Sequence, residues 1–419
     1  MPIEAVSQTT EGHVYILYGN DDLNVGAGVT IRSTNTDAVT TWDGQHRITV
    51  SGTMLGWDDG INMIGTSAAQ TVAIAASGRI ETANDGSIVD ADGVILDGVG
   101  SVLTNAGSIV AQGSGASLFV RDAGTTTVAN SGFMSGIVAG VWHKFGSGTL
   151  NFTNTGTVES PNFAFLGGLG SDNVINKGTL RGMVSLGDGN DSYDGRGGVV
   201  IGTILGGTGD DRFIPGNGAE VIDGGFGDDV LDLSGLTYGV TVDLGAPARD
   251  TGAAVLGDTF ASIETVTGTK YRDYLTGDAL NNTLAGGAAV DFLYGGAGDD
   301  RLVGGASRDR LWGGEGADLF VFETKPDAGD FIHDFNAAVD HILIEGSAFA
   351  YGAYAGAVAA ADFVTSTVAA AQDAADRFIY RTTDNTLWFD GDGTGAGKAT
   401  LLADLQAGAT LTADHLLII

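Results

Sequence analysis

The chain has 419 residues, with 52 acidic and 19 basic side chains, a formal net charge of −33, 69 glycines, 5 prolines and no cysteine. This charge argues against nucleic acid and anionic membrane as direct partners, because both would be repelled, and the lack of cysteine excludes disulfides and thiolate sites. With 43% apolar residues, the composition predicts a folded glycine-rich repeat protein, and the acidic excess favours calcium as a partner.

The start of the chain carries no recognisable leader. Its first 20 residues contain neither a basic n-region nor an apolar h-region, so we expect no N-terminal secretory peptide. The sequence also lacks a run of 18 apolar residues, and we therefore expect no membrane span. Any export information is expected elsewhere in the chain.

A loose repeat recurs through residues 1–182, in which apolar residues flank the tripeptide Asn-x-Gly. Its spacings of 25, 24 and 22 residues are typical of the coils of a parallel β-helix. Asn tolerates the left-handed conformation and can stack its amide on the Asn of the next coil, so we expect recurrent corners. The pattern resembles the β-helical passengers of bacterial surface adhesins, and another β-sandwich is the alternative fold. The repeat centres on Asn105, Asn130, Asn154 and Asn176, with weaker copies at Gly52 and Gly78.

Three short clusters in this region place an aromatic residue near charged ones. Aromatic rings can stack on sugar rings while charges hold carboxylate groups, which makes the clusters candidate sugar-binding or catalytic sites. Ordinary loop and edge residues are the alternative. Because neighbouring strand positions point to opposite faces, we expect Trp142 and Lys144 to share a face that excludes His143. The clusters are Trp42, Asp43, His46 and Arg47; Trp57, Asp58 and Asp59; and Trp142, His143 and Lys144.

A nine-residue unit repeats six times without a gap through residues 268–321, with a carboxylate or amide at position 6 and a large apolar residue at position 8. Three contiguous units cover 206–232, of which one begins with Pro215, and an isolated unit at 186–194 has Leu186 in place of the first glycine. Position 6 is filled by Asp191, Asp211, Glu220, Asp229, Asp273, Asn282, Asp291, Asp300, Asp309 and Asp318. Position 8 of the six ungapped units is filled by Leu275, Leu284, Leu293, Leu302, Leu311 and Phe320.

The first six residues of each unit predict a tight glycine-rich turn, and the last three predict a strand that aims one apolar side chain inward. Parallel strands lie about 4.8 Å apart, so two stacked carboxylates would repel each other by about 3 kcal/mol at an effective dielectric of 20. A calcium ion between the turns reverses the sign of this interaction, because calcium accepts carboxylate and backbone carbonyl oxygens together. A metal-free acidic turn array is the alternative.

The unit closely resembles the calcium-binding nonapeptide of the RTX (repeats-in-toxin) family. The resemblance implies a parallel β-roll in which units n and n+2 stack. One edge would then carry Asp273 and every second position-6 residue after it, and the other edge Asn282 and every second one after it. The resemblance also implies calcium ligands at position 6 and in the turns, namely Asp191, Gly206, Thr208, Gly209, Asp211, Glu220, Gly224, Phe226, Gly227, Asp229, Asp273, Asn282, Gly286, Asp291, Gly295, Ala297, Gly298, Asp300, Gly304, Asp309, Gly313, Glu315, Gly316 and Asp318.

Residues 233–267 lie between the two blocks of repeats and are expected to be a structural spacer within the roll. The segment Phe331–Phe349 resembles the closing strands of RTX proteins. Residues 377–419 are similar to the uncleaved C-terminal signals of bacterial type I exporters, with a plain C-terminal strand as the alternative. Asp390 and Asp392 could add one calcium site, and a simple hairpin turn is the alternative there.

Familiar hydrolase motifs are missing from the sequence. The six histidines never form HExxH, which excludes a zinc protease of the serralysin type. The sequence has no GxSxG elbow for a lipase and no cysteine nucleophile. A polysaccharide lyase or epimerase remains as the enzymatic alternative, because β-helices often host such sites on an exposed sheet.

We therefore predict an all-β protein in three parts: a parallel β-helix-like domain at 1–182, an RTX β-roll at 183–322, and a C-terminal cap with a type I secretion signal at 323–419. Multiple calcium ions are the expected cofactors. The expected function is that of a secreted surface, matrix or adhesion protein that folds on binding calcium outside the cell. Its expected partners are a type I exporter and an extracellular polysaccharide or cell surface, with no nucleic acid.

Overall fold

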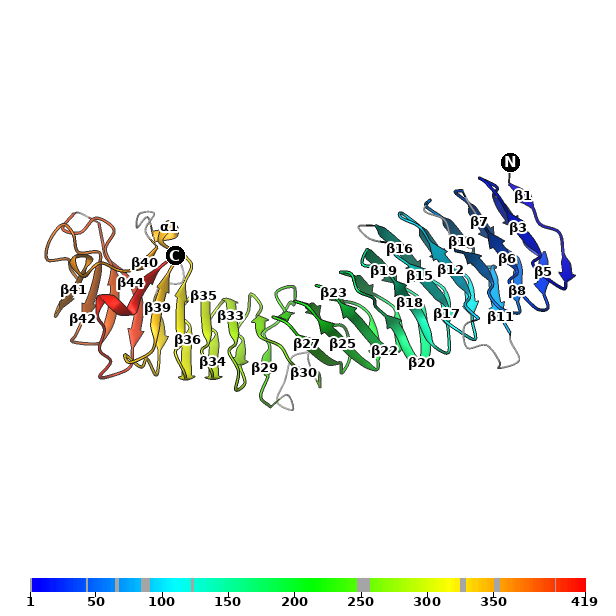
Figure 1. Cartoon of the computed structure of the whole chain (residues 1–419). Coiled ribbons are helices and arrows are strands. Elements are labelled where there is room, and N and C mark those ends of the chain that lie inside the picture. Colours follow the sequence, from blue (N-terminus) through cyan, green and yellow to red (C-terminus); the bar gives the residue numbers. More distant parts are fainter. Residues whose placement is uncertain are drawn as a thin grey trace. The chain divides into compact units, whose positions relative to one another are not determined.

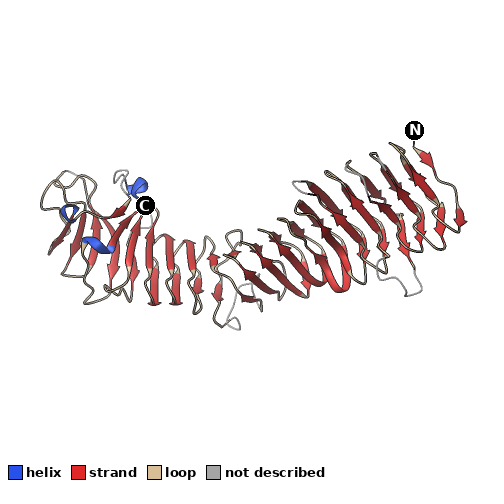
Figure 2. Cartoon of the chain, in the orientation of Figure 1, coloured by secondary structure: helices blue, strands red, loops and turns tan. Residues whose placement is uncertain are grey.

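The computed structural model describes residues 2–42, 44–64, 68–83, 91–121, 124–246, 257–324, 329–349, 355–395 and 397–419. Nearly all regular elements are β-strands, most of them in parallel ladders, which confirms the predicted all-β class (Figure 2). The chain divides into two compact units, Met1–Asp229 with Phe260–Ser262, and Val230–Thr259 with Ile263–Ile419. Within the described residues, no helix has the length and apolar character needed to cross a membrane. The three-part domain division stays a prediction.

Unit 1 is a solenoid whose short strands pair in parallel with the equivalent strands of the coils before and after them (Figure 1, blue to green). This arrangement confirms the predicted parallel β-helix and excludes the β-sandwich. Three ladders run along the solenoid. The first ladder comprises β1 (Ile3–Glu4), β4 (Leu23–Val25), β7 (Arg47–Val50), β10 (Thr71–Ile74), β13 (Val102–Asn105), β16 (Thr125–Asn130), β19 (Thr149–Asn154), β21 (Asn173–Asn176), β23 (Ser192–Asp194) and β26 (Arg212–Ile214).

The other two ladders share the long strands β20 (Thr157–Leu166) and β22 (Thr179–Asp188). The second ladder also comprises β2 (Gln8–Thr10), β5 (Thr30–Ser33), β8 (Thr53–Gly56), β11 (Arg79–Thr82), β14 (Ser108–Val110), β17 (Phe133–Ser135) and β24 (Val199–Ile201). The third ladder also comprises β3 (Tyr15–Leu17), β6 (Val39–Thr41), β9 (Ile61–Met63), β12 (Val94–Asp97), β15 (Ala116–Phe119), β18 (Ala139–Phe145), β25 (Thr203–Thr208) and β27 (Val221–Phe226), and β30 (Thr259–Ala261) follows β27.

An apolar column fills the interior of unit 1 along the first ladder. Its members occupy equivalent positions of successive coils, and none is more than 1% exposed. Burial of such side chains contributes about 1.5–3 kcal/mol each, so the column is a main source of stability for the coil stack. The column consists of Val72, Leu103, Val128, Phe152, Val174, Tyr193 and Phe213.

The predicted stacking of asparagine amides is confirmed. The Nδ2 group of Asn130 donates to Oδ1 of Asn154 at 2.8 Å, and equivalent bonds of 2.8 and 2.9 Å join Asn105 to Asn130 and Asn154 to Asn176. The left-handed conformation that asparagine tolerates is not used here, because none of the four residues has a positive φ. Each is the last residue of an extended strand, and its amide points inward. Asparagine is therefore used here for its paired donor and acceptor.

Unit 2 places consecutive nonapeptides alternately in two sheets (Figure 1, green to red). Leu284 lies opposite Leu302 in one sheet and Leu293 opposite Leu311 in the other, so units n and n+2 stack as predicted. One sheet comprises β28 (Val230–Asp232), β31 (Thr265–Thr267), β33 (Thr283–Ala288), β35 (Arg301–Ala306), β37 (Leu319–Phe322), β39 (His341–Ile344), β45 (Leu416–Ile418) and β40 (Gly356–Ala357). The other comprises β29 (Thr241–Asp243), β32 (Tyr274–Thr276), β34 (Phe292–Ala297), β36 (Arg310–Glu315), β38 (Asp330–Ile332), β44 (Thr400–Leu405), β43 (Thr386–Phe389), β42 (Phe378–Arg381) and β41 (Phe363–Ser366).

The segments on either side of the six ungapped repeats also belong to these sheets. The predicted spacer at 233–267 supplies β29 and β31 as rungs, while its residues 247–256 lie outside the described part of the chain. After the repeats, β44 and β45 pair in parallel with β38 and β39, and antiparallel pairs follow. The helical elements α1 (Gly346–Phe349), η3 (Ala360–Asp362) and η4 (Ala413–His415) connect these strands.

Removing one amide should show what the asparagine ladder contributes. Asn130→Ala leaves one buried N–H of Asn105 without its acceptor and removes one of the two hydrogen bonds that Asn154 Oδ1 accepts, and we expect a loss of about 1–3 kcal/mol in the free energy of unfolding. Asn151→Ala is the matched control, because Asn151 accepts an exposed bond from Asn173 at 2.9 Å across neighbouring coils. Urea denaturation should show a change below about 0.5 kcal/mol for the control. Equal losses in both variants would contradict the buried ladder.

Candidate metal centre

Eight of the repeat turns enclose a small space at position 1 that only a glycine leaves open. A Cβ atom added to Gly286 would lie 2.6 Å from Oδ2 of Asp291 in the same unit and 2.7 Å from the carbonyl oxygen of Gly304 two units on. Both distances are too short for a carbon atom, so the space is bounded by a carboxylate and a backbone carbonyl. Oxygen atoms of these two kinds are what calcium prefers. The same crowding of glycine by the position-6 side chain recurs at Gly206, Gly224, Gly268, Gly277, Gly295, Gly304 and Gly313.

The position-6 residues form columns along the solenoid. The backbone N–H of Asp273 donates to Oδ1 of Asp291 at 2.7 Å, and that of Asp291 donates to Oδ1 of Asp309 at 2.7 Å. Asn282 and Asp300 make the equivalent bonds in the other column, with N–O distances of 2.8 and 3.0 Å. The predicted stacking of alternate units is therefore confirmed. In unit 1, the N–H of Asp191 donates to Oδ1 of Asp211, and the N–H of Asp211 donates to Oδ1 of Asp229.

In five of the column members these bonds use one carboxylate oxygen, and the other oxygen finds no partner among the described residues. The five Oδ2 atoms are buried, and none of the five residues is more than 2% exposed. They belong to Asp191, Asp211, Asp291, Asp300 and Asp318. Ionised oxygens deprived of water are unfavourable unless a cation replaces the water. The residues present therefore fit a hard dication beside Oδ2.

Burial is the main cause of strongly raised pKa values at these carboxyl groups, and neighbouring carboxylates add to it. The pKa of Asp291 is raised to about 8, and those of Asp211 and Asp300 to about 7. Asp318 is raised to about 6. A calcium ion would have to displace the protons that these groups otherwise retain, so metal binding and deprotonation are coupled.

Backbone oxygens must supply much of the metal shell. Within the described residues, no group of three or more Asp, Glu or His side chains is placed to hold one metal ion. The turns provide carbonyls instead, and they do so through positive-φ residues such as Gly287 at +100° and Gly298 at +103°. Ala289 and Ser307 occupy position 4 with φ values of 72° and 109°, a conformation that costs a non-glycine residue free energy.

Three position-6 residues have their acceptors filled by the protein. The two carboxylate oxygens of Asp273 accept hydrogen bonds from the backbone and hydroxyl of Thr269 and from the N–H of Val240. Glu220 accepts from the Tyr193 hydroxyl at 3.3 Å and from a backbone N–H at 2.9 Å. Oδ1 of Asn282 accepts from the N–H of Asp278 at 2.8 Å. These positions are less available to calcium than Asp291 or Asp300.

The isolated unit also departs from the pattern. Asp191 continues the column of unit 1, but Leu186 places a buried side chain at position 1, where eight other units have a glycine. The pKa of Asp191 is raised to about 8, mainly by burial. Asp191 therefore shares the unpaired Oδ2 of the columns but lacks the glycine at position 1.

The columns extend beyond the residues that the sequence indicated. The N–H of Asp309 donates to Oδ1 of Asp330 at 2.9 Å, and that of Asp318 donates to Oδ1 of Asp340 at 3.1 Å. At the other end, the N–H of Asp172 donates to Oδ1 of Asp191 at 2.6 Å. Each of the three newly found residues is followed two positions later by a buried apolar residue, as position 6 is followed by position 8. That local signal could have identified them.

The aromatic clusters predicted in unit 1 are dispersed. His46 and His143 are each 1% exposed, and their Nδ1 atoms lie 2.6 Å from the Asp21 carbonyl and 3.0 Å from the Asp172 carboxylate. The predicted shared face of Trp142 and Lys144 is confirmed by a 4.7 Å separation between Lys144 Nζ and the Trp142 ring centre. Burial of these histidines removes them from any surface site.

The other predicted site residues lie in different surroundings. Asp59 is buried in a stack with Asp37 and Asp92, whereas Trp42 is 61% exposed. Asp43 lies outside the described residues. Asp390 accepts the N–H of Asp392 at 3.3 Å within a turn, which favours the hairpin alternative at this position.

The raised pKa values predict how stability depends on pH when calcium is removed. Between about pH 4 and pH 8 the folded chain retains protons that the unfolded chain releases, so the free energy of unfolding falls as pH rises through this window. We expect protein kept in chelator to melt at a lower temperature at pH 8 than at pH 5.5. Calcium-saturated protein at the same pH values is the control, and its melting temperature at pH 8 should be restored. A melting temperature in chelator that does not change over this window would contradict the buried carboxyl columns.

The chain matches a family model described as the RTX calcium-binding nonapeptide repeat, in four copies, at residues 202–231, 259–293, 267–302 and 294–322. The matched residues contain the glycine spaces and most of the carboxylate columns, while most of unit 1 lies outside them. A search of curated proteins found no match to the chain. The repeats within residues 202–322 are therefore of the RTX type, which binds multiple calcium ions.

Proposed function

We propose that this protein acts outside the cell as a calcium-stabilised surface, matrix or adhesion protein, and that its β-helix recognises an extracellular polysaccharide or cell surface. The observation that carries the proposal is the pair of carboxylate columns in unit 2, whose Oδ2 atoms face spaces that only glycine leaves open. The stacked carboxylates of each column repel one another until a divalent cation lies beside them. Folding of the repeats then depends on a calcium concentration that is met outside cells.

The proposed ligand shell combines one carboxylate with carbonyl oxygens from two stacked turns. In the unit at 295–303 it would involve Asp300 together with the backbone of Gly295, Ala297 and Gly298. The equivalent positions of the neighbouring units supply the other proposed ligands. A Cβ atom added to Gly295 would lie 2.3 Å from Oδ2 of Asp300 and 2.4 Å from the carbonyl oxygen of Gly313, which supports this assignment.

Calcium affinity determines where the repeats fold. Extracellular calcium modules have dissociation constants on the order of 0.1–1 mM, so cytosolic calcium would leave the repeats largely without metal. Each site that fills outside the cell then adds binding free energy to the stability of the folded chain. A chain that remains unfolded inside the cell suits an exporter that threads unfolded substrates.

We further propose that residues 323–419 combine a structural cap with a type I secretion signal. The resemblance of Phe331–Phe349 and of residues 377–419 to the closing segments of exported RTX proteins supports the signal. The parallel pairing of β44 and β45 with the strands that follow the last repeat supports the cap. One segment would therefore direct export first and complete the two sheets afterwards.

A single charge removal tests the calcium sites. Asp291→Asn keeps an Oδ1 acceptor for the N–H of Asp273 but removes the charge beside the glycine space. We expect the midpoint of calcium-induced folding to rise at least threefold, because the affected site loses its anionic ligand. In chelator the same variant should be no less stable than the unchanged protein, because charge repulsion is reduced. Circular dichroism during calcium titration measures both effects.

The matched control is Asp299→Asn in position 5 of the next unit. Asp299 is exposed and accepts the N–H of Ala317 at 2.8 Å, so this change removes a carboxylate charge without touching a column. Its calcium midpoint should stay within about 1.5-fold of the unchanged protein. If Asp299→Asn and Asp291→Asn shift the midpoint equally, the calcium effect reflects overall charge and not the proposed sites.

Export is tested with a passenger protein. We expect a fusion that carries residues 340–419 to be secreted by cells that contain a type I exporter, because those residues include the proposed signal. A fusion of residues 1–182 to the same passenger is the control and should remain in the cytoplasm. Retention of the 340–419 fusion, while an authentic type I signal exports the passenger, would refute the export proposal and leave the calcium proposal intact.

A further inference from the structure

An open pocket of about 560 Å³ lies on the third ladder of unit 1, at the level of three successive coils. Trp42 and Ile64 give it exposed apolar surface, with 61% and 42% of these residues accessible. A pocket of this size with apolar walls and a few convergent polar groups is typical of a small-ligand site. Its lining residues are His13, Asp37, Thr40, Thr41, Trp42, Asn62 and Ile64.

The polar side chains of this pocket are ordered by hydrogen bonds. Thr40 Oγ1 lies 2.8 Å from Asp37 Oδ2 and 2.8 Å from His13 Nδ1. The hydroxyl donates its single proton to the carboxylate and therefore accepts from Nδ1–H of the histidine. Asn62 donates one of its N–H groups to Asp59 at 2.9 Å, which fixes the orientation of its amide.

Strand alternation decides which side chains face this pocket. Thr40 lies opposite Asn62 on the neighbouring coil, so their side chains share the outer face. Thr41 lies opposite the buried Leu17 and points into the core. The pocket therefore offers an aromatic face together with polar groups that are already positioned.

We propose that this pocket binds one or two sugar rings of a neutral polysaccharide, with a ring stacked on Trp42 and sugar hydroxyl groups bonded to Asn62 and His13. This inference rests on the proposed recognition role of the β-helix and assigns it a site. A neutral ligand is favoured because Asp37 lies in the pocket and the chain carries a net charge of −33, which would repel an acidic polysaccharide. The three coils span about 10 Å, which suits a short stretch of polysaccharide chain.

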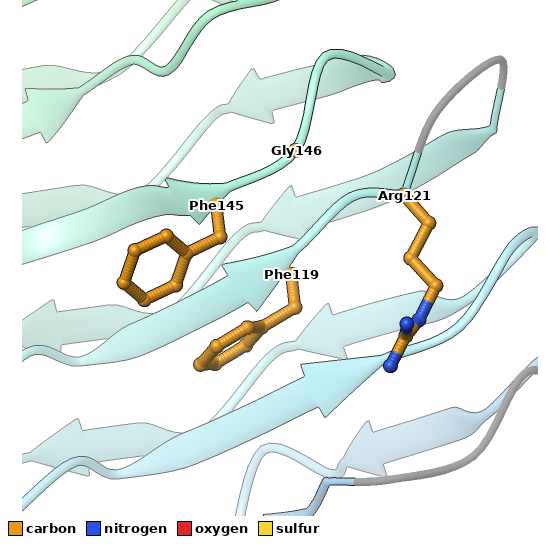
Figure 3. A pocket seen from close by; sticks show the side chains of 4 residues that line it. All are labelled: Phe119, Arg121, Phe145 and Gly146. Atoms are coloured by element: carbon orange, nitrogen blue, oxygen red, sulfur yellow. The ribbon is translucent and has the colours of Figure 1, made fainter.

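A second aromatic surface on the same ladder provides a comparison within the molecule (Figure 3). The side chains of Phe119 and Phe145 project side by side from neighbouring coils, with ring centroids 5.3 Å apart, and contribute to a pocket of about 420 Å³. Of its four lining residues only Arg121 is polar, and Asp97 already accepts two hydrogen bonds from the Arg121 guanidinium. This surface lacks the histidine and the amide that distinguish the Trp42 pocket.

The experiment is affinity electrophoresis of the full chain in saturating calcium, through gels that contain soluble β-glucan, galactomannan or xylan. Trp42→Ala should weaken retardation by the best of these neutral polysaccharides roughly tenfold, because the stacking face is lost. Asn62→Ala should weaken it as well, although it removes no apolar surface. Phe145→Ala is the matched control, because Phe145 is 60% exposed, and it should change retardation by less than twofold.

Calcium midpoints and circular dichroism of all variants should equal those of the unchanged protein, which separates binding from folding. If the unchanged protein is retarded and Trp42→Ala does not alter this, the site assignment fails while polysaccharide recognition by the β-helix stands. Loss of retardation in Phe145→Ala alone would transfer the site to the second surface and also refute the inference. If none of the three polysaccharides retards the unchanged protein, both the inference and the recognition role of the β-helix fail, whereas the calcium proposal is unaffected.

Discussion

One hydrogen bond organises the repeat region: the backbone N–H of a position-6 residue donates to Oδ1 of the carboxylate two units further on. Because each carboxylate receives this bond from the preceding unit of its column, the units must stack in one register. The same bond turns Oδ2 toward the glycine of its own turn. Stacking therefore creates buried anionic oxygens that the protein does not satisfy, and calcium is the ion that satisfies them.

The chain contains two kinds of polar ladder with different chemical requirements. An asparagine amide has both a donor and an acceptor. The residues of the column from Asn105 to Asn176 therefore bond to one another and need no ion. An ionised aspartate has acceptors only, and a column of aspartates must recruit protons or cations. The raised pKa values of Asp211 and Asp291 show that these buried carboxyl groups bind protons more readily than exposed ones do. Dependence on calcium thus follows from one change of side-chain type in a shared solenoid architecture.

Sequence periodicity predicted the ladders because the same residue type recurs at the same place on every coil. Asp330 and Asp340 were missed because their spacings of 21 and 22 residues from the preceding column member depart from the repeat of 18. The satisfied oxygens of Asp273 were also missed, since they depend on Thr269 folding back over the turn. The Trp42 pocket joins residues from three coils, and only its aromatic member was evident from the sequence.

Anomalous diffraction from crystals grown with calcium, or with a lanthanide in its place, tests the central claim most directly. The account predicts two rows of anomalous peaks along the repeats of unit 2, each peak about 2.3–2.6 Å from a position-6 Oδ2 atom and from turn carbonyl oxygens. Peaks should be present beside Asp291 and Asp300, where Oδ2 has no hydrogen bond. Well-ordered repeats without peaks in these rows, at saturating calcium, would contradict the account.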